Sequence, residues 1–182
     1  MKKSLLLLVV AIFTLTTAFD ASAKWTDRNT FGLKGPVKAV YDKNYTISNL
    51  YFEEDGTYIP IEDEFVSQGV FRDDLCRIIG IGYEYADGHY FDYNPSGQVY
   101  KMSRIAGTSF NNIYKYFYDN RGLIIKQILI EIYQHIGGSS DEYKTITTYT
   151  YQKFDKYGNW TKRTAKTGRK SRVETRTITY YE

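Results

Sequence analysis

The densest set of chemically capable side chains in this 182-residue sequence is a group of carboxylates between residues 53 and 74. Its eight acidic residues, among which Arg72 is the one base, are Glu53, Glu54, Asp55, Glu62, Asp63, Glu64, Asp73 and Asp74. A glycosidase needs two carboxylates about 5 to 10 Å apart, and calcium is bound by clustered carboxylate oxygens. A solvated acidic loop has the same composition, and EF-hand spacing is absent. A carbohydrate-active hydrolase using residues 53–74 is therefore the alternative hypothesis.

Basic and aromatic residues are interleaved near the C-terminus, where positive charge exceeds negative charge between residues 160 and 182. Tyrosine and tryptophan rings can stack on sugars, while arginines pair with anionic groups. The candidate ligand-binding residues are Trp160, Tyr149, Tyr151, Arg163 and Arg176. The partners that fit are a glycan, a lipopolysaccharide or another protein of the bacterial envelope. The same charges would also suit a solvent-facing sheet surface that discourages edge pairing.

The residues most often used in catalysis are few and poorly spaced. His89 and His135 both stand beside apolar or aromatic residues, and no pair of residues has the spacing of a zinc site. The lone cysteine, Cys76, lies in the apolar stretch 75–79, which predicts a small buried side chain. No catalytic residue, metal ligand or cofactor is predicted, and a non-catalytic structural or binding role is the leading hypothesis.

The N-terminus predicts export. Lys2 and Lys3 precede an apolar stretch, and the small residues of Ala21–Ala23 match a signal-peptidase site, so residues 1–23 are interpreted as a signal peptide. The apolar stretch is too short to cross a bilayer, and no transmembrane anchor is expected. Residues 24–182 are expected to form one domain in the periplasm or outside the cell, which makes nucleic acid an unexpected partner.

The elements that must position these residues are strands. Four times an aromatic residue precedes a glycine by four positions, with Asp, Asn or Ser between them, in the segments Phe52–Gly56, Tyr93–Gly97, Tyr118–Gly122 and Phe154–Gly158. Such turns between apolar runs indicate β-hairpins, because glycine supplies the positive φ that tight turns need. Asp87-Gly88 is a further hairpin dipeptide. The steps between the four glycines are unequal, which does not suit a strict solenoid.

Residues 123–133 also match one face of a helix, but their isoleucines and the hairpin context favour a long strand. The expected fold is therefore all-β: an antiparallel meander of consecutive β-hairpins forming a curved or rolled sheet of about nine to eleven strands. A variant of it leaves the meander open and covers one of its faces with the N-terminal segment.

The segment Tyr151–Trp160, followed by Arg176–Tyr181, resembles the YD repeats of RHS-like exported bacterial proteins, and Tyr118–Leu123 and Phe91–Gly97 are looser copies. The resemblance covers about residues 50–182. It implies a sheet of consecutive hairpins, in which the glycines form the turns and the aromatic residues before them pack the sheet. It implies no catalytic residue.

Overall fold

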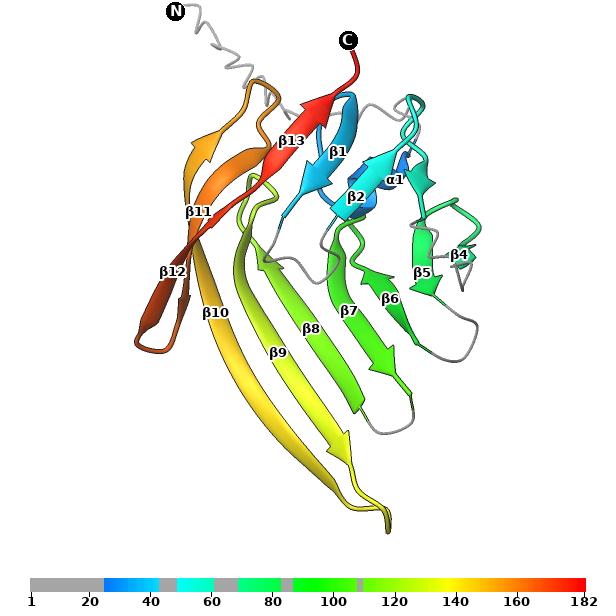
Figure 1. Cartoon of the computed structure of the whole chain (residues 1–182), viewed down its shortest axis with the longest axis vertical. Coiled ribbons are helices and arrows are strands. Elements are labelled where there is room, and N and C mark those ends of the chain that lie inside the picture. Colours follow the sequence, from blue (N-terminus) through cyan, green and yellow to red (C-terminus); the bar gives the residue numbers. More distant parts are fainter. Residues whose placement is uncertain (1–24, 43–48, 61–68, 83–86, 108–109) are drawn as a thin grey trace, which may run out of the picture.

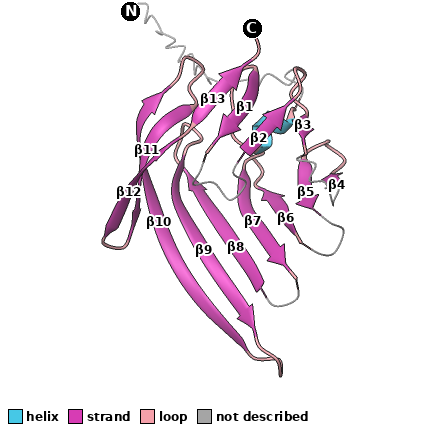
Figure 2. Cartoon of the chain, viewed as in Figure 1, coloured by secondary structure: helices cyan, strands magenta, loops and turns pink. Residues whose placement is uncertain are grey.

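The computed structural model describes residues 25–42, 49–60, 69–82, 87–107 and 110–182. Within these ranges the chain forms thirteen strands and a single helical turn, α1 (Asp27–Thr30) (Figures 1 and 2). None of the helical structure in the described residues is long and apolar enough to cross a membrane. The predicted signal peptide, residues 1–23, lies outside the described residues and stays a prediction.

Nine strands form one antiparallel sheet, in which each strand pairs with its neighbours along the chain. In chain order they are β4 (Gly69–Arg72), β5 (Ile78–Gly82), β6 (Gly88–Tyr93), β7 (Val99–Ala106), β8 (Phe110–Tyr118), β9 (Ile124–Gln134), β10 (Ser140–Phe154), β11 (Trp160–Thr167) and β12 (Lys170–Thr175). The predicted all-β meander of consecutive hairpins is confirmed, and residues 124–133 are strand rather than helix.

Four strands form a second antiparallel sheet in the order β13-β1-β2-β3. Their bounds are β1 (Val37–Tyr41), β2 (Asn49–Phe52), β3 (Tyr58–Ile59) and β13 (Thr177–Tyr180). Arg176 alone separates β12 from β13, so one extended segment leaves the large sheet and enters the small one. The N-terminal strands therefore cover one face of the meander, as in the second of the two expected arrangements (Figure 1).

The core lies between the two sheets. Val37 and Phe52 from the small sheet and Ile78 from the large sheet are fully buried there. Leu33, Phe91, Val99, Met102 and Tyr114 belong to the same cluster. We call the side of the large sheet that carries this cluster the inner face and the opposite side the outer face. The long strands β8 to β10 extend well beyond the small sheet (Figure 1).

Six hairpins share one turn geometry. In each, the N–H of the first turn residue donates to the carbonyl of the fifth, and the N–H of the fourth donates to the carbonyl of the first. The turns are 53–57, 73–77, 94–98, 119–123, 135–139 and 155–159. The fourth residue has a positive φ in every case. The four turns predicted from Gly56, Gly97, Gly122 and Gly158 are confirmed.

The turn at 73–77 was not predicted, because Cys76 stands where the other five turns have glycine. Its φ is +61°, and it is the single described non-glycine residue with a positive φ. Asp73 holds the turn by accepting hydrogen bonds from the N–H groups of Leu75 and Arg77, at 3.0 and 2.9 Å. Cys76 is exposed, so the prediction of a buried side chain was wrong. Apolar neighbours in sequence did not imply burial, since the chain reverses at this point.

Two other local predictions also differ from the structure. Gly88 is not a turn residue, because it pairs with Gly82 across the β5–β6 ladder, and the connection falls in residues 83–86, outside the described residues. Phe154 does not pack the core: it is 41 % exposed, whereas Phe52 at the equivalent position is fully buried. The β10–β11 ladder is irregular between Tyr151 and Phe154, so the alternation of faces is interrupted there.

Candidate functional site

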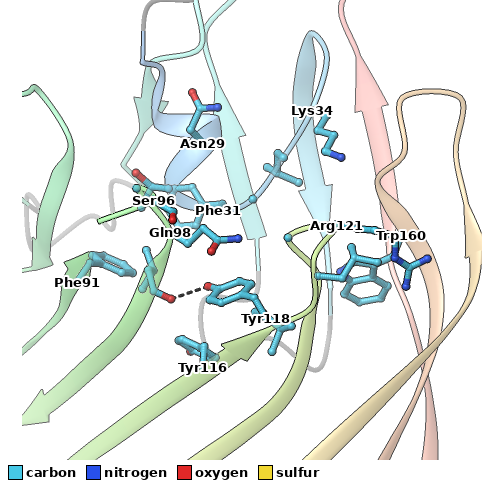
Figure 3. A pocket seen from close by; sticks show the side chains of 18 of the residues that line it. Asn29, Phe31, Lys34, Phe91, Ser96, Gln98, Tyr116, Tyr118, Arg121 and Trp160 are labelled. Carbon is cyan, nitrogen blue, oxygen red and sulfur yellow. Dashed lines mark hydrogen bonds between the residues drawn. The ribbon is translucent and has the colours of Figure 1, made fainter. Parts of the chain in front are cut away.

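A cavity of about 420 Å³ opens between the N-terminal segment 25–34 and the inner face of the large sheet. Figure 3 shows it from close by, with Phe31 and Lys34 on one side and Tyr116, Tyr118 and Trp160 on the other. Its apolar lining includes Phe31, Leu33, Phe91, Val99, Met102, Leu123 and Ile124. A cavity of this size is in the range of small-molecule sites in proteins.

The N-terminal segment is held over the sheet by polar contacts at its start. Arg28 donates from Nε to the carbonyl of Val37 at 2.8 Å and from a terminal nitrogen to the carbonyl of Glu53 at 2.6 Å. Asp27 pairs with Arg72 at 2.5 Å and accepts the N–H of Tyr58 at 2.7 Å. These bonds pair the buried carboxylate of Asp27 and tie the segment to strands of both sheets, which keeps the segment in one place.

The other end of the segment is attached to the turn at 155–159. Asn159 accepts the N–H of Lys34 and donates to the carbonyl of Lys34, both at 2.8 Å, and it also donates to the Tyr180 hydroxyl at 3.0 Å. Asp155 begins the turn and accepts hydrogen bonds from the backbone of Tyr157 and Asn159 and from Tyr180. Although partial burial would raise the pKa of Asp155, these hydrogen bonds hold that pKa below its usual range.

Four cationic residues line the cavity: Lys34, Arg121, Arg163 and Arg176. No aspartate or glutamate is among its lining residues in the described chain. Arg121 is bound to Asp119 of its own turn at 2.8 Å but keeps a largely exposed side chain. The charged side chains that line the cavity in the described chain are therefore all cationic, although Arg121 and Arg163 are each paired with a carboxylate that lies outside the lining.

Arg163 is the most constrained of these cations. It is 5 % exposed, and its Nε donates to Glu174 at 2.7 Å. Its guanidinium carbon lies 4.0 Å from the ring centre of Tyr149 and 4.1 Å from that of Trp160. Burial would lower the pKa of Arg163, but the charge of Glu174 and the neighbouring tyrosines raise it, so the side chain stays cationic. Its terminal nitrogens make no hydrogen bond to a described residue, which leaves them available to the cavity.

Trp160 holds a second arginine as well. The guanidinium carbon of Arg176 lies 4.1 Å from its ring centre, and the Arg176 Nε donates to the Trp160 carbonyl at 2.7 Å. Because two guanidinium groups already occupy the ring, the indole is an anchor for cations rather than an open stacking surface. Trp160 is itself buried.

The structure brings together all five residues that the sequence singled out as ligand-binding candidates. Trp160, Tyr151, Arg163 and Arg176 line the cavity, and Tyr149 stands behind Arg163 with its hydroxyl bound to Gln127 at 3.0 Å. Whether they bind a ligand stays a prediction. Sequence reasoning missed Lys34 and Arg121. The signal for Arg121 was its place in the predicted turn at 119–123, which has the same hydrogen-bond pattern as the turn at 155–159.

None of the described acidic residues of the 53–74 stretch lines the cavity. Glu53, Glu54 and Asp55 form an exposed turn, Asp73 pairs with Arg77 at 2.6 Å, and Glu62, Asp63 and Glu64 lie outside the described residues.

His135 is paired with Asp141 at 3.0 Å on the exposed β9–β10 turn. His89 lies on the inner face, where burial and the charge of Arg104 lower its pKa to about 4. Within the described residues, no group of three or more His, Cys, Asp or Glu side chains could hold a metal ion.

A scan against models of known protein families found no family that matches this chain, and a search of curated proteins found no match either.

Proposed function

We propose that this protein is an exported, non-catalytic binding protein of the bacterial envelope, and that its cavity holds a small anionic amphiphile. The observation that carries the proposal is the lining of the cavity: four cations and no carboxylate in the described chain, on an otherwise apolar and aromatic wall. An anionic head group would pair with the cations, and an apolar body would contact Phe31, Leu33 and Met102. A ligand that has an anionic head group and an apolar body would therefore match both the cationic and the apolar parts of the lining.

The buried arginine supports an anionic group over a neutral one. Burying a guanidinium is costly unless its donors are paired. Glu174 accepts from the Nε of Arg163 and also from the Nε of Arg172 at 2.8 Å, so one carboxylate serves two cations. A carboxylate or phosphate in the cavity would complete the hydrogen bonding of Arg163 in the bidentate geometry that guanidinium groups favour.

The arrangement of the rings argues for this ligand class rather than for a neutral glycan. Sugar stacking needs an open aromatic face, but the rings of Trp160 and Tyr149 each face a guanidinium about 4 Å away. These aromatic residues instead fix the directions of Arg163 and Arg176. Pre-organised cations of this kind bind anions with little loss of side-chain entropy.

Two ligands of equal chain length and opposite charge distinguish the contribution of charge to binding from that of apolar contact. In calorimetric titrations we expect decanoate to bind and decyltrimethylammonium, its cationic counterpart, to bind at least about tenfold more weakly, because the lining is cationic. Equal affinity for the two, or binding of neither, would contradict the proposal.

Variants at the two accessible cations test the site itself. Lys34→Gln and Arg121→Gln should each weaken decanoate binding about five- to tenfold, as expected for the loss of one partly exposed ion pair. Lys156→Gln is the matched control, since Lys156 lies in the turn that holds Lys34 but does not line the cavity. An equal loss in all three variants would show only a general effect of net charge.

A further inference from the structure

The outer face of strands β7 to β10 carries a compact group of isoleucines. Residues paired across an antiparallel ladder share a face. Ile113 pairs with Ile130, and Ile128 pairs with Ile146, so these four side chains stand in two adjacent rows. Ile132 lies in the next row, opposite Asn111. All five are on the side of the sheet opposite Tyr114 and Leu129, which face the core.

Lysines border the isoleucines within the same rows. Lys115 pairs with both Lys101 and Ile128, while Ile130 pairs with Lys144. Lys126 pairs with Phe117, and its Nζ lies 4.1 Å from the centre of that ring. Glu142, opposite Ile132, is the one acidic residue of these rows on β7 to β10, and Asp92 of β6 continues the row of Lys101 at its edge. Four lysines and one glutamate therefore surround an apolar centre.

No second layer covers this group in the described part of the chain, because α1 and the small sheet pack against the inner face. Ile146 is 47 % exposed and Phe117 is 41 % exposed. The solvent-facing side of an antiparallel sheet is ordinarily polar, with hydrophobic residues confined to the core side. Here the alternation places isoleucine on the side facing away from the core.

We propose that the outer face of β7 to β10 docks on the surface of an anionic phospholipid bilayer. The choice of partner follows from charge complementarity: an apolar patch bordered by lysines fits a surface that has negative head groups above an apolar interior. The lysines contact the head groups, and the isoleucines and Phe117 enter the interfacial region. Lys101 contributes less than the others, since Asp92 already pairs with it at 2.6 Å.

This surface is separate from the cavity, which opens on the inner face. Docking through the outer face would therefore leave the cavity accessible to ligands from the aqueous side. The two proposals rest on different residues, and one can fail without the other.

Co-sedimentation with vesicles tests the docking. The protein should bind vesicles of 70 % phosphatidylcholine and 30 % phosphatidylglycerol, but not vesicles of pure phosphatidylcholine. Binding should weaken as the salt concentration is raised, because charges near a membrane surface are screened within about 8 Å at physiological ionic strength. The double variant Lys115→Glu/Lys126→Glu should lower the partition coefficient by about thirtyfold or more, since each lysine near an anionic surface contributes about a fivefold effect. Lys170→Glu with Lys38→Glu is the matched control, as it makes the same charge change off the outer face.

The apolar contribution has its own control. Ile146→Ser should reduce vesicle binding several-fold, whereas Ile136→Ser, on the fully exposed β9–β10 turn outside the rows, should not. Failure to bind anionic vesicles at low salt would overturn the proposal, as would equal losses in the lysine variant and its control. The double variant Lys34→Gln/Arg121→Gln should leave vesicle binding unchanged. A loss of vesicle binding in this variant would show that the lipid contacts the cavity instead of the outer face. A concentration-dependent dimer that Ile146→Ser abolishes would assign the face to a second copy of the chain instead.

Discussion

Replacing Asn159 with alanine should detach the end of the N-terminal segment at Lys34 from the sheet, and it also removes a side-chain hydrogen bond to Asp155 within the turn. The side chain is 2 % exposed and connects two parts of the chain 125 residues apart. It satisfies both the N–H and the carbonyl of Lys34 at 2.8 Å. In Asn159→Ala these two groups and the Tyr180 hydroxyl lose a partner that water cannot fully replace.

The size of the effect follows from the number of bonds. Each intramolecular hydrogen bond contributes about 1 kcal/mol net, and a buried group left unpaired costs about 1 to 3 kcal/mol. We expect the free energy of unfolding to fall by about 2 to 3 kcal/mol. Urea denaturation should show this as a midpoint lowered by about 1 M with an unchanged slope, given a typical slope of about 2 kcal/mol per molar.

Gln98→Ala is the matched control, since Gln98 occupies the same position in the turn at 94–98. Among the described residues its side chain accepts a hydrogen bond from Asn94 of its own turn, at 3.2 Å, and no other, so a loss of about 0.5 kcal/mol is expected. Asn159→Asp should fall between wild type and Asn159→Ala, because it keeps the acceptor for Lys34 and loses the donor. A change below about 0.5 kcal/mol in Asn159→Ala would refute the reasoning, since it would mean that the segment is held by its other contacts alone.

Three further outcomes are expected. His89 has a pKa of about 4 in the folded state, below its unfolded value of about 6.5. As the pH falls, the unfolded chain therefore takes up a proton on His89 before the folded chain does. The free energy of unfolding should consequently fall by about 2 to 3 kcal/mol between pH 6.5 and pH 4. His89→Leu should remove that part of the pH dependence of the thermal midpoint. Cys76→Gly should raise stability by about 0.5 kcal/mol in urea denaturation, because glycine adopts φ +61° without the penalty that a side chain has there; a lower midpoint would contradict the turn geometry. Gly35→Ala should destabilise the protein by about 2 kcal/mol or more, since the added Cβ would lie 2.6 Å from the Tyr157 ring. Gly107→Ala is the control, because open space surrounds that position. It should lower the stability only by the cost of a side chain at positive φ, about 1 kcal/mol.

The hairpins were predictable because their signals are local. A turn such as 119–123 needs an aspartate that accepts the N–H groups of Arg121 and Leu123, and a glycine with a positive φ. Both requirements are met within five residues, so a short stretch of sequence shows them. The same argument failed at 73–77, because Cys76 adopts the glycine conformation without having the glycine signature. Local signals identify residues that favour a conformation, and they miss residues that are forced into one.

The candidate site was predictable in part. Tyr149, Tyr151, Trp160 and Arg163 lie on adjacent strands of one hairpin, so their proximity follows from the β10–β11 pairing. Their roles did not follow: the spacing suggested stacking surfaces, whereas the folded chain places guanidinium groups over the rings of Tyr149 and Trp160. That difference depends on side-chain directions near an irregular stretch of the ladder, which the sequence pattern does not specify.

The sequence by itself determined the order of the strands in the large sheet, the positions of four turns and the antiparallel character of that sheet, because hairpin formation joins neighbours along the chain. Only the tertiary structure decided which face of that sheet is covered, since strand alternation presents apolar residues on both sides: Tyr114 and Leu129 on one, Ile113 and Ile130 on the other. The pairing of β1 with β13 places the cover on the inner face. This long-range contact brings Lys34 beside residues from the far end of the chain, and it thereby forms the cavity and leaves the isoleucines of the outer face without a second layer in the described chain.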